Sequence, residues 1–98
     1  MQVIVTVGSI MDQEVDVIVN PANERLLHGG GLCGIIYDAI LRTGRNNYQK
    51  LMDDIEKIPT IDDNGTRCDY GDAKITGAYG LRFKYLIHTV GAIEGRHN

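Results

Sequence analysis

The chain has 98 residues, a formal net charge of −3 and 43% hydrophobic residues, a size that allows at most one domain. This charge gives no electrostatic reason to expect a nucleic acid or a membrane surface as partner, and no apolar run approaches the length that spans a bilayer. Two cysteines are too few for an evident disulfide framework or metal site. Because no signal peptide is apparent either, we expect a cytoplasmic protein.

The first half of the chain predicts two strands followed by a helix. Gln2–Val7 alternates its valines with other residues and ends at Gly8, as a strand does. A second strand over Val15–Val19 is apolar on both faces, which is typical of a central strand, and it ends at Asn20-Pro21. After a polar loop, apolar residues with helical spacing predict a helix that ends near Gly44. They are Leu32, Ile35, Ile36, Ala39 and Ile40.

The second half predicts another helix and two more strands. Arg45-Asn46-Asn47 offers an N-cap for a helix that ends at Pro59, with Tyr48, Leu51, Met52 and Ile55 on one face. Residues 61–70 form a turn-rich loop. Ala73–Thr76 and Lys84–Val90 are predicted to be strands, and the short connection between them favours antiparallel pairing.

Three glycines, Gly29, Gly30 and Gly31, lie at the N-terminus of the first predicted helix. Glycine allows close approach of the backbone to a ligand, and the free N–H groups of a helix start favour an anion such as phosphate. Glycine-rich turns also occur where a strand only packs against a helix. A phosphate site and simple backbone packing both remain open on these residues alone.

Four blocks of the sequence, in order and at plausible spacings, together resemble the macrodomain family. The resemblance implies a three-layer α/β/α sandwich around a mixed sheet, and it covers nearly the whole chain. Residues 1–98 would form the N-terminal portion of one macrodomain, a truncated fold that lacks the C-terminal strands and helices. The blocks are Gly8-Ser9-Ile10, then Val19-Asn20-Pro21-Ala22-Asn23 with His28-Gly29-Gly30-Gly31, then Cys68 to Thr76, and finally Lys84 to Gly91.

The resemblance implies that some elements of the family fold have no counterpart in this sequence. They include two strands that would lie between the first and second strands, and a second glycine loop that closes over the diphosphate. Unpaired backbone groups cost free energy wherever they are shielded from water. We therefore expect rearrangement, exchange of strands with another copy in a homo-oligomer, or pairing with a partner that supplies the rest.

The resemblance also implies ligand contacts within the first loop. Asn23 would hydrogen-bond the distal ribose, since an amide offers both a donor and an acceptor to a sugar diol. Asn20 is a second candidate ligand contact, although both asparagines also suit a role in pinning the loop. The glycines with the start of the helix would form the wall around the ribose and diphosphate. These positions are Gly29, Gly30, Gly31, Leu32 and Cys33.

Two positions depart from the family pattern. Ser9 replaces an aspartate that accepts a hydrogen bond from the adenine amine, so adenine recognition should weaken, while Ile10 retains its backbone N–H. Cys33 stands where one branch of hydrolases has an aspartate that helps to activate water. At a helix start this thiol could be reactive, whereas beside apolar residues it would be a small buried hydrophobe.

The function that the resemblance implies is binding of ADP-ribose or of an ADP-ribosylated protein. Hydrolysis of the bond between ADP-ribose and an acidic side chain would use Asn23, through positioning, and His28 as candidate catalytic residues. A structural role for His28 is the alternative, and His88, within a strand, is expected to be structural. A non-catalytic reader module and a fragment that no longer binds ligand are the other readings. No metal or other cofactor is implied.

Overall fold

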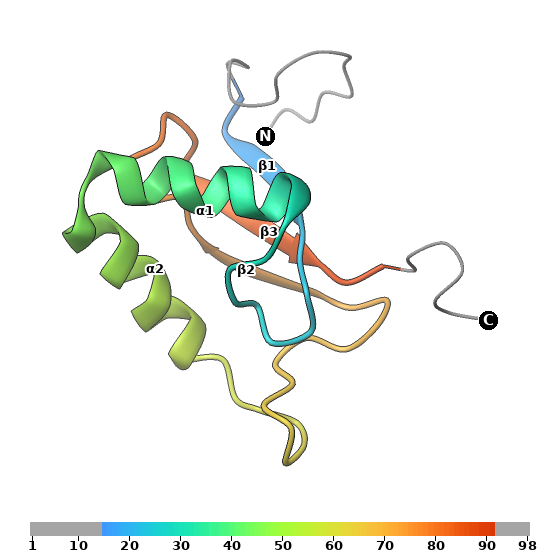
Figure 1. The fold of residues 1–98 in the computed structure, drawn as a ribbon. Helices are drawn as coiled ribbons and strands as arrows, with labels where there is room; N and C mark the ends of the chain where they lie inside the picture. Colours follow the sequence, from blue (N-terminus) through green and yellow to red (C-terminus); the bar gives the residue numbers. More distant parts are fainter. Residues whose placement is uncertain (1–14, 92–98) are drawn as a thin grey trace.

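A computed structural model describes residues 15–91 of the chain. The elements run in the order β1 (Val17–Pro21), α1 (Gly31–Thr43), α2 (Arg45–Glu56), β2 (Ala73–Gly77) and β3 (Tyr85–Thr89) (Figure 1). The predicted strand Gln2–Val7 and the candidate residues Ser9 and Ile10 lie outside the described residues. Within the described range, no helix is long and apolar enough to cross a bilayer.

The three strands form one mixed sheet in the order β1-β3-β2. β3 is central, parallel to β1 and antiparallel to β2, which confirms the predicted pairing of the last two strands. The register places Asn20 of β1 opposite His88 of β3, and His88 opposite Lys74 of β2. Parallel β1 and β3 need a long crossover, and the chain from α1 to β2 supplies it.

β1 begins and ends two residues later than the sequence predicts. Pro21 is the last residue of the strand, where its missing N–H does not interrupt the hydrogen bonds between the strands. The backbone N–H of the next residue, Ala22, donates to Thr89 O at 2.8 Å. The sequence predicts a central strand, whereas β1 lies at the edge of the described sheet, where it pairs with β3. Val19 is 43% exposed, because only one face of the described sheet is covered by helices.

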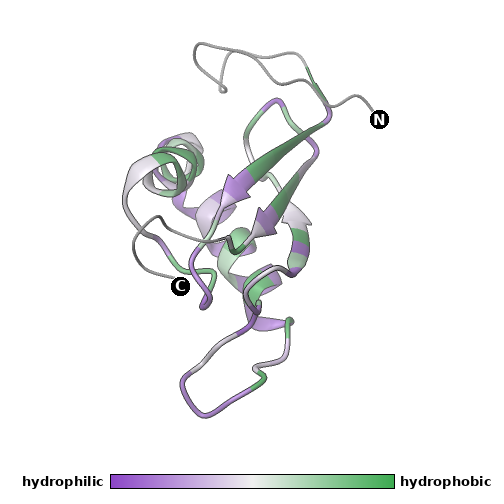
Figure 2. Ribbon diagram, turned by 90° about the vertical axis from the view of Figure 1, so that its right-hand side faces the viewer, coloured by the Kyte–Doolittle hydropathy of each residue, from purple (hydrophilic) through white to green (hydrophobic). Residues whose placement is uncertain are grey.

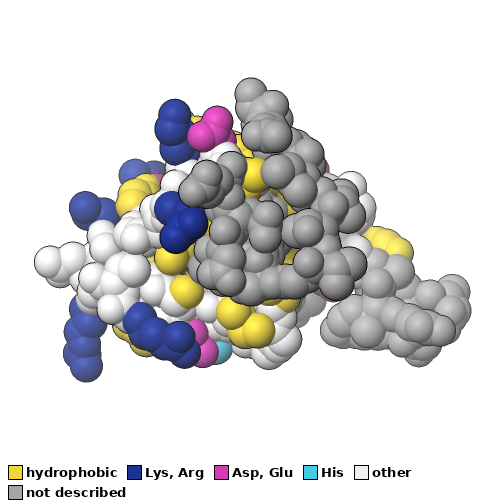
Figure 3. Space-filling view, turned by 90° about the horizontal axis from the view of Figure 1, so that it is seen from above, with side chains coloured by type: hydrophobic (Ala, Val, Ile, Leu, Met, Phe, Trp, Pro, Cys, Tyr) yellow, Lys and Arg dark blue, Asp and Glu magenta, His cyan; other side chains and the backbone are white. Residues whose placement is uncertain are grey.

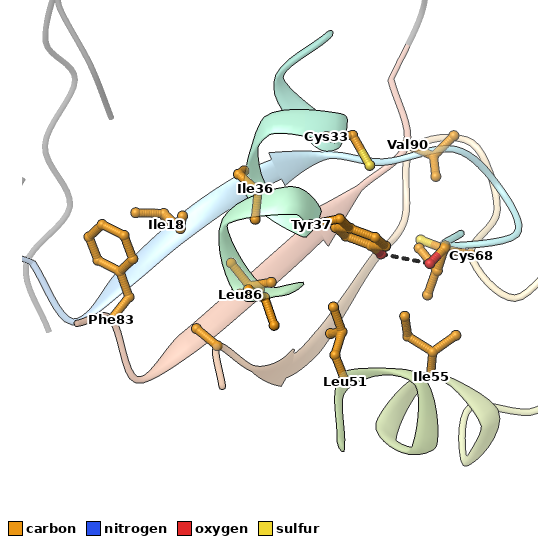
Figure 4. Packing of buried hydrophobic residues seen from close by; sticks show 13 residues of the cluster. Ile18, Cys33, Ile36, Tyr37, Leu51, Ile55, Cys68, Phe83, Leu86 and Val90 are labelled. Carbon is orange, nitrogen blue, oxygen red and sulfur yellow. Dashed lines mark hydrogen bonds between the residues drawn. The ribbon is translucent and has the colours of Figure 1, made fainter. Parts of the chain in front are cut away.

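Both helices lie on the same face of the sheet, with α1 packed against β1 and α2 against β2 (Figures 1 and 2). The core between these two layers is built from side chains of both helices, of β1 and β3, and of the connecting segments (Figure 4). Its fully buried members include Ile36, Tyr37, Ile40, Leu51 and Leu86. The opposite face of the sheet carries Val19, Ile75 and Tyr85, each at least 43% exposed.

The buried stripe of α1 differs from the predicted one. Ile35 is 57% exposed, whereas Cys33 and Tyr37 are buried with Ile36 and Ile40. The helix is rotated so that the Tyr37 ring enters the core and its hydroxyl reaches the preceding loop, a partner that hydrophobic spacing does not reveal. The helix ends at Gly44 as predicted.

α2 follows α1 after a single residue. Gly44, with φ +147°, serves both helices as a cap, so Arg45, Asn46 and Asn47 lie inside α2 and the prediction that they form its N-cap was wrong. The helix ends at Glu56, before Pro59. Leu51 and Ile55 are buried as their spacing predicts. The sharp corner holds α2 beside α1 over the same sheet.

Candidate functional site

The loop between β1 and α1 is organised by the side chain of Asn23. Its Oδ1 accepts hydrogen bonds from the backbone N–H groups of Arg25 and Leu27, both at 3.1 Å, and its Nδ2 donates to Leu27 O at 2.7 Å. Asn23 therefore pins the loop, one of the two roles that the sequence allows. One N–H of its amide has no partner among residues 15–91. The amide nitrogen lies beside Gly29, where a Cβ atom would be only 3.3 Å from it.

Leu26 has an unusual backbone conformation in this loop. It adopts φ +60° although it is not glycine, and its side chain is fully buried. The Tyr37 hydroxyl donates to Leu26 O at 2.6 Å (Figure 4). Burial raises the pKa of Tyr37, so this hydroxyl keeps its proton and its donor role. Sequence reasoning missed Tyr37 because it was absent from the predicted apolar stripe.

The glycines follow at the N-terminus of α1, where the sequence predicts them. Gly30 is the N-cap, and no side chain caps the helix or places an acidic group in its first turn. The early N–H groups, those of Gly31, Leu32 and Cys33, precede the first intrahelical bond, in which Gly34 N donates to Gly30 O at 3.2 Å. Together with the helix dipole they favour an anion.

Gly34 explains how the loop lies so close to the helix. A Cβ atom at this position would collide with the carbonyl oxygen of Gly29 and would lie 3.6 Å from the His28 ring. Only glycine leaves room for this packing. Sequence reasoning singles out the three preceding glycines but not Gly34. Its position one turn into the helix, after those glycines, could have identified it.

His28 is fixed from the helix side. Its Nε2 lies 2.8 Å from Asp38 Oδ1, and both side chains are nearly half exposed. The ring also meets Tyr37 edge-on, with ring centroids 5.9 Å apart. Asp38 was not among the predicted site residues, although its position one turn after Gly34 places it on the flank of α1 that faces the loop.

Asn20 lies beneath the loop in a buried polar chain that joins all three strands. Its Nδ2 lies 2.9 Å from His88 Nδ1, and His88 Nε2 lies 2.9 Å from Thr76 Oγ1. Because Nδ2 can only donate, this geometry assigns Nδ1 as the acceptor and Nε2–H as the donor. Burial lowers the pKa of His88 to about 4, so it is neutral near pH 7. His88 is structural, as expected.

The remaining predicted site residues differ in their exposure. Gly30 and Gly31 are exposed and Leu32 is half-buried. Cys33 is 4% exposed, with its Sγ 3.6 Å from Asn20 Nδ2, which matches the reading of a small buried hydrophobe. Asn20 is fully buried. Their contacts with a ligand stay predictions.

The N–H donors at the start of α1 belong to the backbone, and no basic side chain caps this helix. Where described residues are visible in Figure 3, Lys and Arg side chains lie scattered, with hydrophobic side chains between them. In the described part of the chain, no three His, Cys, Asp or Glu side chains are arranged to hold a metal ion. The arrangement of N–H donors at the glycines suits phosphate and sugar oxygens.

Comparison with known proteins places this geometry in a family. The family model described as Macro domain matches residues 19–98. The chain belongs to the macrodomain family. A macro domain-containing protein of Xanthomonas axonopodis pv. citri is 39% identical to it over the whole chain and 51% of that relative. The ADP-ribose glycohydrolase MACROD2 of Xenopus laevis is 40% identical over 92% of the chain and 18% of that protein.

Solved macrodomains share the fold. The Oceanobacillus iheyensis macrodomain with ADP matches 92% of the chain and 44% of its own length, with a TM-score of 0.69 and 33% identity. The Trypanosoma brucei macrodomain in complex with ADP-ribose matches 87% of the chain, with a TM-score of 0.59 and 30% identity. The chain spans about half the length of the curated macrodomains it matches. The described structure therefore corresponds to part of an α/β macrodomain fold, as the resemblance implied.

Proposed function

We propose that this chain binds ADP-ribose, free or attached to a protein, with the diphosphate and the terminal ribose at the N-terminus of α1. The observation that carries the proposal is the uncapped start of this 13-residue helix, which the glycines place beside the unpaired N–H of Asn23. The macrodomains of Oceanobacillus iheyensis and Trypanosoma brucei were solved with ADP and ADP-ribose, which supports the choice of ligand.

Each group has a distinct task in this proposal. The exposed Gly30 and Gly31 let the diphosphate approach the backbone, and the early N–H groups of α1 donate to its oxygens. Asn23 donates its remaining N–H to a ribose hydroxyl. Its acceptor oxygen is already saturated by Arg25 and Leu27, so the amide offers the sugar a donor only.

A calorimetric titration of ADP-ribose into the chain tests the proposal. Asn23→Asp keeps an oxygen to accept from Arg25 and Leu27, but it removes both N–H groups, including the one that donates to Leu27 O, and adds a negative charge. We expect this variant to lose binding, while the exposed helix variant Asn46→Ala binds like the wild type. A folded wild-type chain that binds no ADP-ribose, or an Asn23→Asp variant that binds as tightly, contradicts the proposal.

Hydrolysis of an ADP-ribosyl ester is a second candidate, favoured by the exposed imidazole of His28 next to the glycines. Water would attack the anomeric carbon, the bond to the acidic side chain would break, and the released carboxylate would take the bonding electrons. The proton lost from water would pass to His28 or to a phosphate oxygen of the substrate. The relative from Xenopus laevis is named a glycohydrolase.

Release of ADP-ribose from a protein modified on glutamate measures this activity. We expect slow release by the wild type, because Cys33 supplies no carboxylate, and faster release by Cys33→Asp if hydrolysis is a property of the site. Binding without release in both proteins would leave the chain a reader of ADP-ribose.

A further inference from the structure

The imidazole of His28 is held in one orientation by three neighbours. Nε2 lies 2.8 Å from Asp38 Oδ1, and the ring meets Tyr37 at an interplanar angle of 78°. Its Cε1 edge lies over Gly34, where a Cβ atom would be 3.6 Å away. Two of these contacts come from side chains of α1, so the helix sets the orientation of a ring that belongs to the loop.

This arrangement also decides which ring nitrogen carries the proton. A carboxylate can only accept a hydrogen bond, so the Asp38 contact requires a proton on Nε2. In the neutral imidazole, Nδ1 is then left with its lone pair as an acceptor. Nδ1 has no hydrogen-bond partner within residues 15–91.

Three acceptors around Asn23 already receive hydrogen bonds. Asn23 Oδ1 accepts from two backbone N–H groups, and Leu27 O accepts from Asn23 Nδ2. Leu26 O accepts from the Tyr37 hydroxyl. The N–H groups at the start of α1 suit phosphate but cannot accept from a sugar hydroxyl, whereas His28 Nδ1 can.

We propose that Asp38 is a positioning residue that fixes His28 with its proton on Nε2, so that Nδ1 accepts a hydrogen bond from a hydroxyl of the bound ligand. The site then prefers a diphosphate that carries a terminal sugar over one that does not. This inference rests on the proposed binding of ADP-ribose and deepens it, because it names the residues that recognise the terminal ribose.

Variants of Asp38 separate this role from folding. The contact between Asp38 and His28 is half exposed, and an exposed polar contact contributes little to folding, so Asp38→Ala should remain folded. Asp38→Asn retains an oxygen that can accept from Nε2–H, whereas Asp38→Ala removes it. Asp63→Ala, a substitution of another exposed aspartate, is the matched control.

Affinities for ADP-ribose and for ADP, which lacks the terminal ribose, give the first measurement. Asp38→Ala should weaken ADP-ribose binding by roughly three- to tenfold, the effect of about one neutral hydrogen bond, and leave ADP binding unchanged. Asp38→Asn and Asp63→Ala should bind both ligands like the wild type. An equal loss for both ligands, or no loss for either, would overturn the inference.

Nitrogen-15 NMR of the His28 ring gives the second measurement and needs no ligand. At alkaline pH, where the imidazole is neutral, the wild type and Asp38→Asn should carry the proton on Nε2, and Asp38→Ala should show a mixture of both tautomers. A proton on Nδ1 in the wild type overturns the inference whatever the ligand does. A wild type with the Nε2 proton that binds no ADP-ribose instead overturns the proposed function, and the ribose contact with it.

Discussion

The two faces of the sheet differ in what the described chain places on them. One face lies under α1 and α2 and holds both the apolar core and the polar chain from Asn20 through His88 to Thr76. The other face presents Val19, Ile75 and Tyr85, each at least 43% exposed. The candidate site depends on the covered face, because its loop is shaped by its own hydrogen bonds and by contacts with α1. Backbone bonds from Arg67 and Cys68 to Glu24 O, and from Ala22 to Thr89 O, tie the same loop to the segment before β2 and to β3. Stability and ligand binding should therefore respond to changes on the covered face and tolerate changes on the open one.

The largest effect is expected from the core of the covered face. Leu86 in the central strand β3 is fully buried, and Leu86→Ala removes buried methyl groups and leaves a cavity. We expect the free energy of unfolding to fall by about 2 to 5 kcal/mol, measured by urea denaturation. A loss as small as that of an exposed residue would mean that the two layers are not packed together in solution.

Lowering the pH should reduce the free energy of unfolding through His88, the buried histidine of the covered face. His88 has a pKa of about 4 in the folded chain, below its usual 6.5, because burial disfavours the charged ring. The unfolded chain therefore takes up a proton first as pH falls, and stability present above about pH 6.5 is lost progressively toward pH 4. The full loss corresponds to about 3 kcal/mol.

Denaturation curves at several pH values between these limits measure that loss. His88→Gln should flatten the dependence on pH, while His28→Ala, which removes an exposed histidine, should leave most of it in place. A dependence that survives in His88→Gln would show that other groups cause it.

The hydroxyl of Tyr37 connects the covered face to the site. Tyr37→Phe leaves the buried Leu26 O without its donor, which should cost about 1 to 2 kcal/mol of unfolding free energy. Tyr85→Phe, on the open face, is the matched control and should change stability by no more than about 0.5 kcal/mol. Equal effects of the two variants would contradict the role given to the Tyr37 hydroxyl.

The smallest effect is expected on the open face itself. Ile75 is 60% exposed on β2, so Ile75→Ala should change the free energy of unfolding by no more than about 0.5 kcal/mol. If Ile75→Ala lowers the free energy of unfolding as much as Leu86→Ala does, and light scattering gives a mass above the 10.8 kDa of one chain, a second copy covers this face. The two faces would then not differ as described.

Sequence reasoning found the elements whose signals are local. Helical spacing and glycines place α1 and α2 within a few residues, and the four blocks of motif lead to the right family. The antiparallel pair β2 and β3 follows from their short connection. These features need no knowledge of what lies across the fold.

The contacts that shape the site were hidden because they join residues from different elements. Asp38 on α1 reaches His28 on the loop, and Tyr37 reaches Leu26, neither of which follows from hydrophobic spacing. Ile35 satisfies the helical pattern and yet is exposed, since which flank of an apolar helix faces the sheet is decided by packing. Asn20 resembles a ligand contact in its motif but lies buried on His88.

The most direct test of the central claim is an NMR titration of the isotopically labelled chain with ADP-ribose, followed residue by residue. Binding at the start of α1 predicts shifts of the backbone amides from Gly30 to Cys33 and of the Asn23 side-chain amide, with Ile75 and Tyr85 on the open face unchanged. Shifts confined to the open face, or a folded chain whose spectrum does not change, would contradict the account.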